Sequence, residues 1–261
     1  MNRNFSVALL GTGAADHLWN RYGEPGVRGS AMALLNRSVL IDYGATAEAA
    51  LNRYAVTPDQ LTDLVFTHSH SDHFNPEATA RLLAGHPGRL AVHASPEILA
   101  RLAATVDPAG FTQCPLHPGA GFVAGGMRFT ALPANHLLAD PEEQAYHYLI
   151  EQDQKRLLYA LDGAGFTKPE WLLIRNVRLD AMVIDCTMAR PGDWRIFEHN
   201  DLDTVVHLLK TLRNAKVVDD STRVVLSHLA YTLWPESSEE AAAIVSGSGL
   251  ELAFDGMTFE V

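Results

Sequence analysis

The sequence feature that most constrains the fold is a short loop crowded with potential metal ligands. The segment Thr67-His68-Ser69-His70-Ser71-Asp72-His73 follows an apolar run, residues 64–67, that is typical of a buried strand, and a helix is predicted after it. Such a loop lies at the carboxyl end of a strand, where ligands bind in α/β sheets. Alternate residues, His68 and His70, can face one metal ion, while Asp72 and His73 face a second. Imidazole and carboxylate donors without thiolate suit zinc, manganese or iron.

One loop cannot complete two metal sites, so we expect further ligands from distant parts of the chain. Three candidates stand where apolar, strand-like runs end: His136, Asp162 and His228. Taken alone, each would more often be an ordinary hydrogen-bonding residue. Their position at strand ends, together with the loop, favours a shared metal centre.

Apolar patterning predicts a mixed α/β chain with a strand-rich beginning. The expected strands are residues 5–10, 31–35, 39–41, 64–67, 90–93, 123–133, 146–151, 157–161, 181–184 and 223–226. The expected helices are 45–54, 76–83, 97–104, 169–174, 202–212 and 236–245, with a closing hairpin near Asp255-Gly256. We find no repeat or long linker and expect one domain over residues 1–261. Either a doubly wound sheet or two sheets with outer helices fits this order.

Composition excludes several classes of function. The chain has 261 residues and a net charge of −11, from 31 acidic and 20 basic side chains. An acidic surface repels phosphate backbones, so we expect no DNA partner and disfavour RNA. Cys114 and Cys186 are too few for a disulfide framework or a cysteine zinc site, which favours a reducing, cytoplasmic location. The N-terminal segment 1–5 has no apolar signal core, and no apolar run is long enough for a membrane span.

The combined motif set resembles the metallo-β-lactamase superfamily. The resemblance implies an αββα four-layer sandwich with two divalent metal ions, zinc or manganese, at one edge. It assigns one metal to His68, His70 and His136, the other to Asp72, His73 and His228, and the bridge between them to Asp162. Asp42 resembles the family's upstream aspartate, which braces the metal loop without being a ligand. His70 stands where diiron members carry a carboxylate, which favours hydrolytic chemistry.

Within the superfamily, the chain is most similar to the phosphodiesterases of the carbon–phosphorus lyase pathway, with tRNA 3′-processing endonucleases as relatives. The similarity lies in segments 182–186, 199–205, 226–228 and 254–257. Those phosphodiesterases hold a structural zinc with loop cysteines and a histidine. Here the loop 13–29 has no cysteine and Tyr231 stands at the histidine position, so we expect no such zinc. Trp19 and Tyr22 are then the expected anchors of the loop.

The expected reaction is hydrolysis of a small phosphodiester, such as a cyclic sugar phosphate, by a hydroxide held between the two metals. The catalytic residues would be Asp72, through its metal, and His199, as the general acid that protonates the leaving oxygen. Arg190 and Arg195 are candidates to contact the phosphate, and His17 is a candidate to line the same cleft. Family members are often dimers, so we also expect a homodimer.

Other functions remain open at this point. A lactonase or other carboxyl-ester hydrolase would use the same metal set. A tRNA 3′-end endonuclease would need a basic arm, whereas the Gly/Pro-rich region 107–126 contains no Lys or Arg. A non-catalytic, metal-dependent carrier of the same fold is the third alternative.

Overall fold

Two β-sheets of seven strands each form the centre of the structure, a computed structural model that describes residues 5–261. The first sheet has the strand order β14(Met257–Glu260), β1(Ser6–Gly11), β2(Met32–Leu35), β3(Val39–Ile41), β4(Asp63–Val65), β5(Ala91–Ala94), β6(Thr112–Pro115). The second has the order β13(Glu251–Leu252), β12(Arg223–Ser227), β11(Ala181–Asp185), β10(Lys155–Ala160), β9(Tyr146–Gln152), β8(Met127–Pro133), β7(Gly121–Ala124). Most of the N-terminal segment 1–5, which gave the expectation about a signal peptide, lies outside the described residues.

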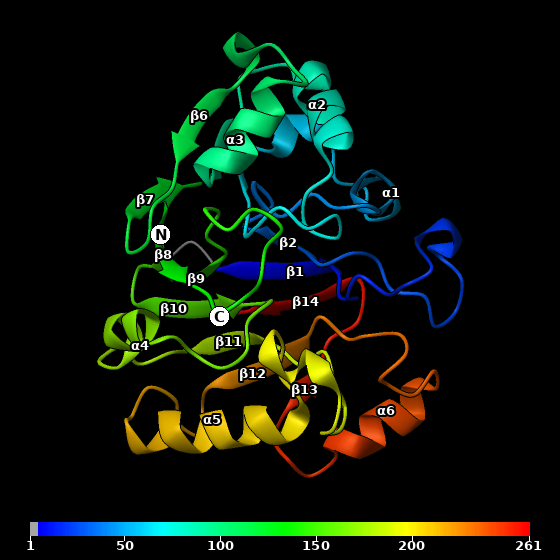
Figure 1. Ribbon diagram of the computed structural model, residues 1–261, viewed down its shortest axis with the longest axis vertical. Coiled ribbons are helices and arrows are strands. Elements are labelled where there is room, and N and C mark those ends of the chain that lie inside the picture. Colours follow the sequence, from blue (N-terminus) through cyan, green and yellow to red (C-terminus); the bar gives the residue numbers. More distant parts are fainter. Residues whose placement is uncertain (1–4) are drawn as a thin grey trace.

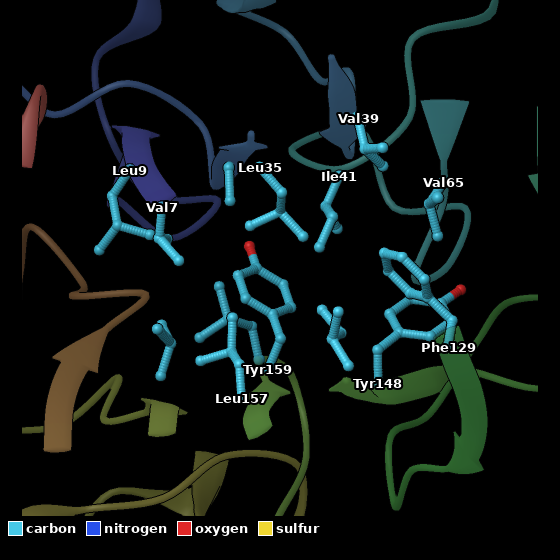
Figure 2. Close-up of a cluster of buried hydrophobic side chains, with 14 of the residues drawn as sticks. Val7, Leu9, Leu35, Val39, Ile41, Val65, Phe129, Tyr148, Leu157 and Tyr159 are labelled. Carbon is cyan, nitrogen blue, oxygen red and sulfur yellow. The ribbon is translucent and has the colours of Figure 1, made fainter. Parts of the chain in front are cut away.

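The two sheets stack because their strands are apolar on both faces. In β1, Val7 and Leu9 point into the layer between the sheets, whereas Leu10 points to the opposite face. The period of two along a strand produces this alternation. Figure 2 shows the layer between the sheets, where Tyr148 and Tyr159 from the second sheet meet aliphatic side chains of the first. Residues of this layer are almost fully buried, so it forms the central core of the sandwich.

Helices cover the outer face of each sheet (Figure 1). The helices α1(Ala47–Arg53), α2(Pro76–Gly85) and α3(Pro96–Ala103) pack on the first sheet, and α4(Lys168–Ile174), α5(Leu202–Asn214) and α6(Ser238–Val245) pack on the second. The layers therefore run helix, sheet, sheet, helix, which confirms the expected αββα sandwich. Among the described residues, no helix combines the length and hydrophobicity needed to cross a lipid bilayer.

Two predictions based on the apolar pattern are wrong at glycine turns, where the chain changes direction or sheet. The single strand expected at 123–133 is the hairpin β7–β8, since Gly125 and Gly126 both adopt positive φ and reverse the chain. The hairpin expected at Asp255-Gly256 is instead a crossover from β13 in the second sheet to β14 in the first. Strand β6 was not predicted, because its side chains are mostly exposed and carry no apolar alternation.

The strand directions bring the ligand-bearing loops to one edge of the sandwich. The pairs β3–β4 and β10–β11–β12 are parallel, so their carboxyl ends lie at the same edge of each sheet. Strand β8 runs in the same direction as β10, because both are antiparallel to β9. Backbone hydrogen bonds join the two sheets there, from Tyr146 to Thr67 and from Leu229 to Thr12.

Gly44 allows the turn after β3 to approach the metal loop, and this contact can be tested. A Cβ atom at Gly44 would lie 1.9 Å from the carbonyl oxygen of Asp72. We therefore expect Gly44→Ala to lower the free energy of unfolding by about 3 kcal/mol or more, measured by urea denaturation. Gly85→Ala is the matched control, since a Cβ at Gly85 meets no atom within 4 Å, and it should change stability by less than about 1 kcal/mol. Similar stabilities for the two variants would contradict the close approach.

Candidate metal centre

The seven candidate ligands converge where the carboxyl ends of strands from both sheets meet. His68, His70, Asp72 and His73 follow β4, and His136, Asp162 and His228 follow β8, β10 and β12. Their donor atoms form two adjoining groups, and within each group all donor atoms lie within 4.8 Å of one another. Residues more than 150 positions apart in the chain therefore meet at one place, because the two sheets share this edge.

The first group consists of the three imidazoles of His68, His70 and His136. The Nδ1 atom of His70 lies 3.0 Å from Nε2 of His136. The Nε2 atom of His68 is buried and has no hydrogen-bond partner in the described structure. Burial lowers the pKa of His68 well below its ordinary value and lowers the pKa of His136 to about 4. These imidazoles are therefore neutral and carry lone pairs, the form in which histidine binds a metal.

The second group consists of Asp72, His73, Asp162 and His228, all buried. The Nε2 atom of His228 lies 3.2 Å from Asp72 Oδ2 and 3.2 Å from Asp162 Oδ1. The Nε2 atom of His73 lies 2.8 Å from Asp162 Oδ2. Burial would raise the pKa of Asp162, but the imidazoles of His228 and His73 hold it well below its ordinary value. Asp162 is thus a carboxylate, and its Oδ1 also lies 3.8 Å from Nε2 of His136 in the first group.

Four of the five candidate histidine ligands present one ring nitrogen to the centre and hold an oxygen with the other. The pairs are His68 with Thr67 Oγ1 at 3.0 Å, His73 with Asp42 Oδ2 at 2.8 Å, His136 with the carbonyl of Glu198 at 3.3 Å, and His228 with Thr187 Oγ1 at 2.9 Å. Outer oxygens of this kind fix the tautomer and orientation of histidine ligands in metal sites. The arrangement therefore matches the expected bracing role of Asp42 and extends it to the other rings.

These donors fit divalent metal ions. Two pairs of imidazole nitrogens face each other, His70 with His136 at 3.0 Å and His73 with His228 at 3.4 Å, and only a proton or a cation can lie favourably between such lone pairs. The partnerless Nε2 of His68 is a further donor aimed at the same place. A set of imidazoles and carboxylates without thiolate is chemically suited to zinc or manganese.

The backbone at this edge is held in an uncommon conformation. Asp42, Asp162 and His228 have φ of +64°, +61° and +60°. Non-glycine residues seldom adopt this left-handed region, and each instance costs of the order of 1 kcal/mol. All three residues directly follow or nearly follow a strand, so the left-handed turn points their side chains back over the strand ends.

His199 lies beside the second group and pairs with a buried carboxylate. Its Nδ1 atom is 2.7 Å from Oδ2 of Asp185, and its ring stacks on His228 with centroids 5.1 Å apart. Burial alone would lower the pKa of His199, but Asp185 raises it to about 9. The residue is therefore protonated at neutral pH, with Nδ1 engaged and Nε2 left for another acceptor. Asp185, His199, Asp162 and His228 also form a third group with metal-ligand spacing.

Asp185 and Asn200 are functional candidates that the sequence analysis missed as individual residues. Asp185 ends the apolar strand β11 just as Asp162 follows β10, and that repeated pattern was the available signal. Asn200 donates from Nδ2 to the carbonyl of Gly163 and accepts at Oδ1 from the N–H of Gly165, at 2.8 and 2.9 Å. Its own N–H donates to Asp185, so Asn200 joins the turn carrying Asp162 to the Asp185–His199 pair.

Three other candidates lie apart from the metal groups. Arg195 is held by the carboxylate of Asp193, and its Nη1 lies 3.9 Å from Asp16. Arg190 is exposed and lines a separate surface hollow with Pro191 and neighbouring residues. His17 is buried, with its Nε2 2.9 Å from the carbonyl of Leu229. A phosphate contact by either arginine stays a prediction, and His17 belongs to a different cavity, described below.

Comparison with known proteins agrees with this geometry. A sequence profile described as the beta-lactamase superfamily domain matches residues 37–229, a span that includes Asp42 and all seven candidate ligands. A search of curated protein sequences gives no significant match.

Solved structures share the fold over almost the entire chain. A diphosphatase from the PhnP family superposes with a TM-score of 0.74 at 18% identity, covering 100% of this chain and 98% of that one. Zn(2+)-bound PqqB from Methylobacterium extorquens gives 0.75 at 17% identity, covering 98% and 100%. The short form of human tRNase Z gives 0.70 at 16% identity, covering 97% and 98%. At such identities the likeness establishes the common fold.

The two donor groups predict two metal ions per chain. Protein purified without chelator, or reconstituted with Zn²⁺ or Mn²⁺, should contain two equivalents by elemental analysis. His136→Ala should retain one, because the remaining two imidazoles of its group cannot keep the affinity of three. His207→Ala is the matched control, since His207 is an exposed histidine on α5. At most one equivalent in the reconstituted wild-type protein would contradict the prediction.

Proposed function

The chain belongs to the beta-lactamase superfamily, and on that premise we propose that it is a binuclear metal-dependent hydrolase that cleaves a small phosphodiester. The observation that carries the proposal is the shared carboxylate of Asp162, which touches donors of both metal groups. A structural metal site needs one closed group of about four ligands, whereas two open groups joined by one carboxylate are typical of catalytic pairs.

His68, His70 and His136 would hold one ion, Asp72, His73 and His228 would hold the other, and Asp162 would lie between them. Bound there, the two ions would lower the pKa of a water molecule and stabilise negative charge on phosphate oxygens. Asp42, Thr67 and Thr187 keep the imidazoles in the required tautomers. Most of these groups are buried, which limits the access of bulk water and strengthens their electrostatic effect on a bound diester.

His199 is placed to move the proton that the leaving alkoxide needs. Asp185 accepts a hydrogen bond from Nδ1–H, so the proton on Nε2 is the transferable one when the ring is charged. The Asn200 N–H holds Asp185, the partner of His199, and the stacking on His228 keeps the ring beside the metal groups. A general acid in this position contributes roughly 10²- to 10⁴-fold when the leaving group is a poor one.

The surroundings of the centre favour a small substrate over a polyanion. Trp194 and Phe197 are 66% and 75% exposed on the short 3₁₀ turn that leads into His199, and Leu137, next to His136, is 66% exposed. Exposed apolar side chains beside the centre suit a compact ester better than an RNA backbone, whose binding depends on phosphate contacts from Lys and Arg. The net charge of −11 acts in the same direction.

Hydrolysis of bis(p-nitrophenyl) phosphate by the Mn²⁺- or Zn²⁺-loaded protein tests the proposal. We expect turnover well above the metal-only blank, with p-nitrophenyl acetate and a simple lactone cleaved less efficiently. Preference for the carboxyl esters would instead identify a lactonase or esterase, and cleavage of a tRNA precursor alone would identify an endonuclease. No hydrolysis of any of these by protein with both metals bound would leave the carrier alternative and overturn the proposal.

The role of His199 predicts an effect that depends on the leaving group. His199→Ala should lower kcat by roughly 10- to 1000-fold on a 2′,3′-cyclic nucleotide, whose leaving oxygen needs a proton. The loss should be much smaller on bis(p-nitrophenyl) phosphate, whose leaving anion is stable without one. Asp185→Asn should give the same pattern more weakly.

The comparison of the two substrates requires that the metal content of each variant is measured and that a control variant is included. His207→Ala should be indistinguishable from wild type on both substrates. Equal losses on the two substrates would show that His199 positions the phosphate, and a lost metal ion would show that His199 is a ligand.

A further inference from the structure

A cavity next to the segment that follows His228 is lined by none of the candidate metal ligands. It has a volume of about 350 Å³ and lies between the N-terminal loop 13–29 and the segment 230–236 that follows His228. Phe254 and Asp255, in the crossover between the sheets, complete its wall. The loop is the blue segment at the right of Figure 1, opposite the amino end of α6. This volume is within the range of small-molecule sites.

Hydrogen bonds hold the loop 13–29 against the segment that follows His228. Asp16 accepts hydrogen bonds from the N–H groups of Tyr231 and Thr232 and from the Thr232 hydroxyl, at 2.8, 3.0 and 2.6 Å. The ring of His17 lies between the carbonyl of Leu229 and the N–H of Arg28. The loop is therefore held mainly by Asp16 and His17. Of the two anchors expected from the sequence, Tyr22 packs against the hydrophobic cluster between the first sheet and its helices. Trp19 joins none of the described hydrophobic clusters.

Arg28 brings a poorly solvated positive charge to this cavity. Its Nη1 donates to Thr12 Oγ1 and to the carbonyl of Ala253, both at 2.7 Å. Burial lowers the pKa of Arg28, although Asp255 opposes the shift. The hydroxyl of Thr12 separates the guanidinium from Asp255, so the two charges do not touch. Within residues 5–261, Arg28 has no carboxylate at ion-pair distance, and its Nε and Nη2 have no hydrogen-bond partner.

The acidic side chains of the cavity all accept hydrogen bonds, whereas neither arginine of its lining forms an ion pair with a described carboxylate. Glu24 pairs with Arg21 at 2.6 Å, and Glu236 accepts from the Tyr231 hydroxyl at 2.8 Å. Asp255 accepts from the Gly29 N–H and the Thr12 hydroxyl. Arg53, the second arginine of the lining, lies over the rings of Tyr22 and Tyr54, 5.6 and 5.9 Å from their centroids, and forms no ion pair with any described residue.

The remaining wall is apolar and flat. Trp234 is largely buried with its indole N–H bonded to the carbonyl of Cys186, so its ring presents a fixed apolar surface. Phe254, on another part of the lining, is 58% exposed. The cavity thus combines guanidinium groups that form no ion pair with aromatic side chains, the composition of sites that hold an anionic group attached to a ring.

We propose that this cavity is a binding site for a small aromatic anion, whose oxyanion group is held by Arg28 and Arg53 and whose ring lies against Trp234 and Phe254. The site is distinct from the metal centre and does not depend on the proposed phosphodiesterase activity. Its wall includes Ala230 and Tyr231, which follow His228 in the chain, so an occupant would also order the segment behind that histidine.

Binding of two bromine-labelled probes, 4-bromobenzoate and 4-bromophenylphosphonate, tests the proposal on the metal-loaded protein. Calorimetry should give a site occupied at submillimolar to millimolar concentration for at least one probe. The affinities of the carboxylate probe and the phosphonate probe, compared with each other, show which oxyanion the site prefers. The anomalous signal of bromine in soaked crystals should locate the probe between Arg28 and Phe254, apart from any copy bound at the metal ions.

Variants separate this site from the metal centre. Arg28→Gln should weaken binding at the cavity by about 10- to 100-fold, and Arg53→Gln by about 3- to 10-fold. Arg37→Gln is the matched control, because Arg37 is an exposed arginine in the turn between β2 and β3. Arg28→Lys, which keeps the charge, and the soaked wild-type crystal decide the question if Arg28→Gln does not fold. Bromine found only at the metal ions, or cavity binding unchanged by both glutamine variants, would overturn the proposal.

Discussion

The carboxylate of Asp162 is the interaction on which the centre of this molecule depends. It is buried, lies in hydrogen-bonding or ion-pairing range of imidazoles from both donor groups, and projects from a left-handed turn at the end of β10. A buried charge of this kind is costly unless several partners surround it. The sandwich supplies those partners because its two sheets end at the same edge. The architecture is thus the means by which one carboxylate reaches histidines from four separate loops.

Oxygen atoms that hydrogen-bond the second ring nitrogen of the histidines support the same centre. Thr67, Asp42 and Thr187 each fix one imidazole, and Asn200 ties the turn of Asp162 to the Asp185–His199 pair. These contacts explain how strained backbone at Asp42, Asp162 and His228 persists, since the surrounding hydrogen bonds determine the conformation more strongly than local preference does. They also separate two proposed roles, the imidazoles that would hold metal ions and the protonated His199 that would transfer a proton.

Local patterns predicted most strands and the ligand-bearing loops, whereas the αββα layers followed only from the family resemblance, because the order of strands and helices also fits a doubly wound sheet. Apolar runs followed by His or Asp located β4, β10 and β12, and the resemblance then ordered the ligands. Patterns could not show the reversal at Gly125-Gly126 or the crossover at Asp255-Gly256, since a glycine turn is compatible with a hairpin, a bulge or a change of sheet. Asn200 and the Asp16 contacts were equally hidden, because they join residues that only the folded chain brings together. The same holds for the unpaired guanidinium of Arg28.

The central claim is that two metal ions bind at the edge where Asp162 lies between the two donor groups. A crystal structure of the reconstituted protein, with anomalous data at the metal edge, tests it most directly. The account predicts two peaks, one bounded by His68, His70 and His136 and the other by Asp72, His73 and His228, with Asp162 between them and His199 unligated. A single peak, or a peak coordinated by Asp185 and His199, would contradict it.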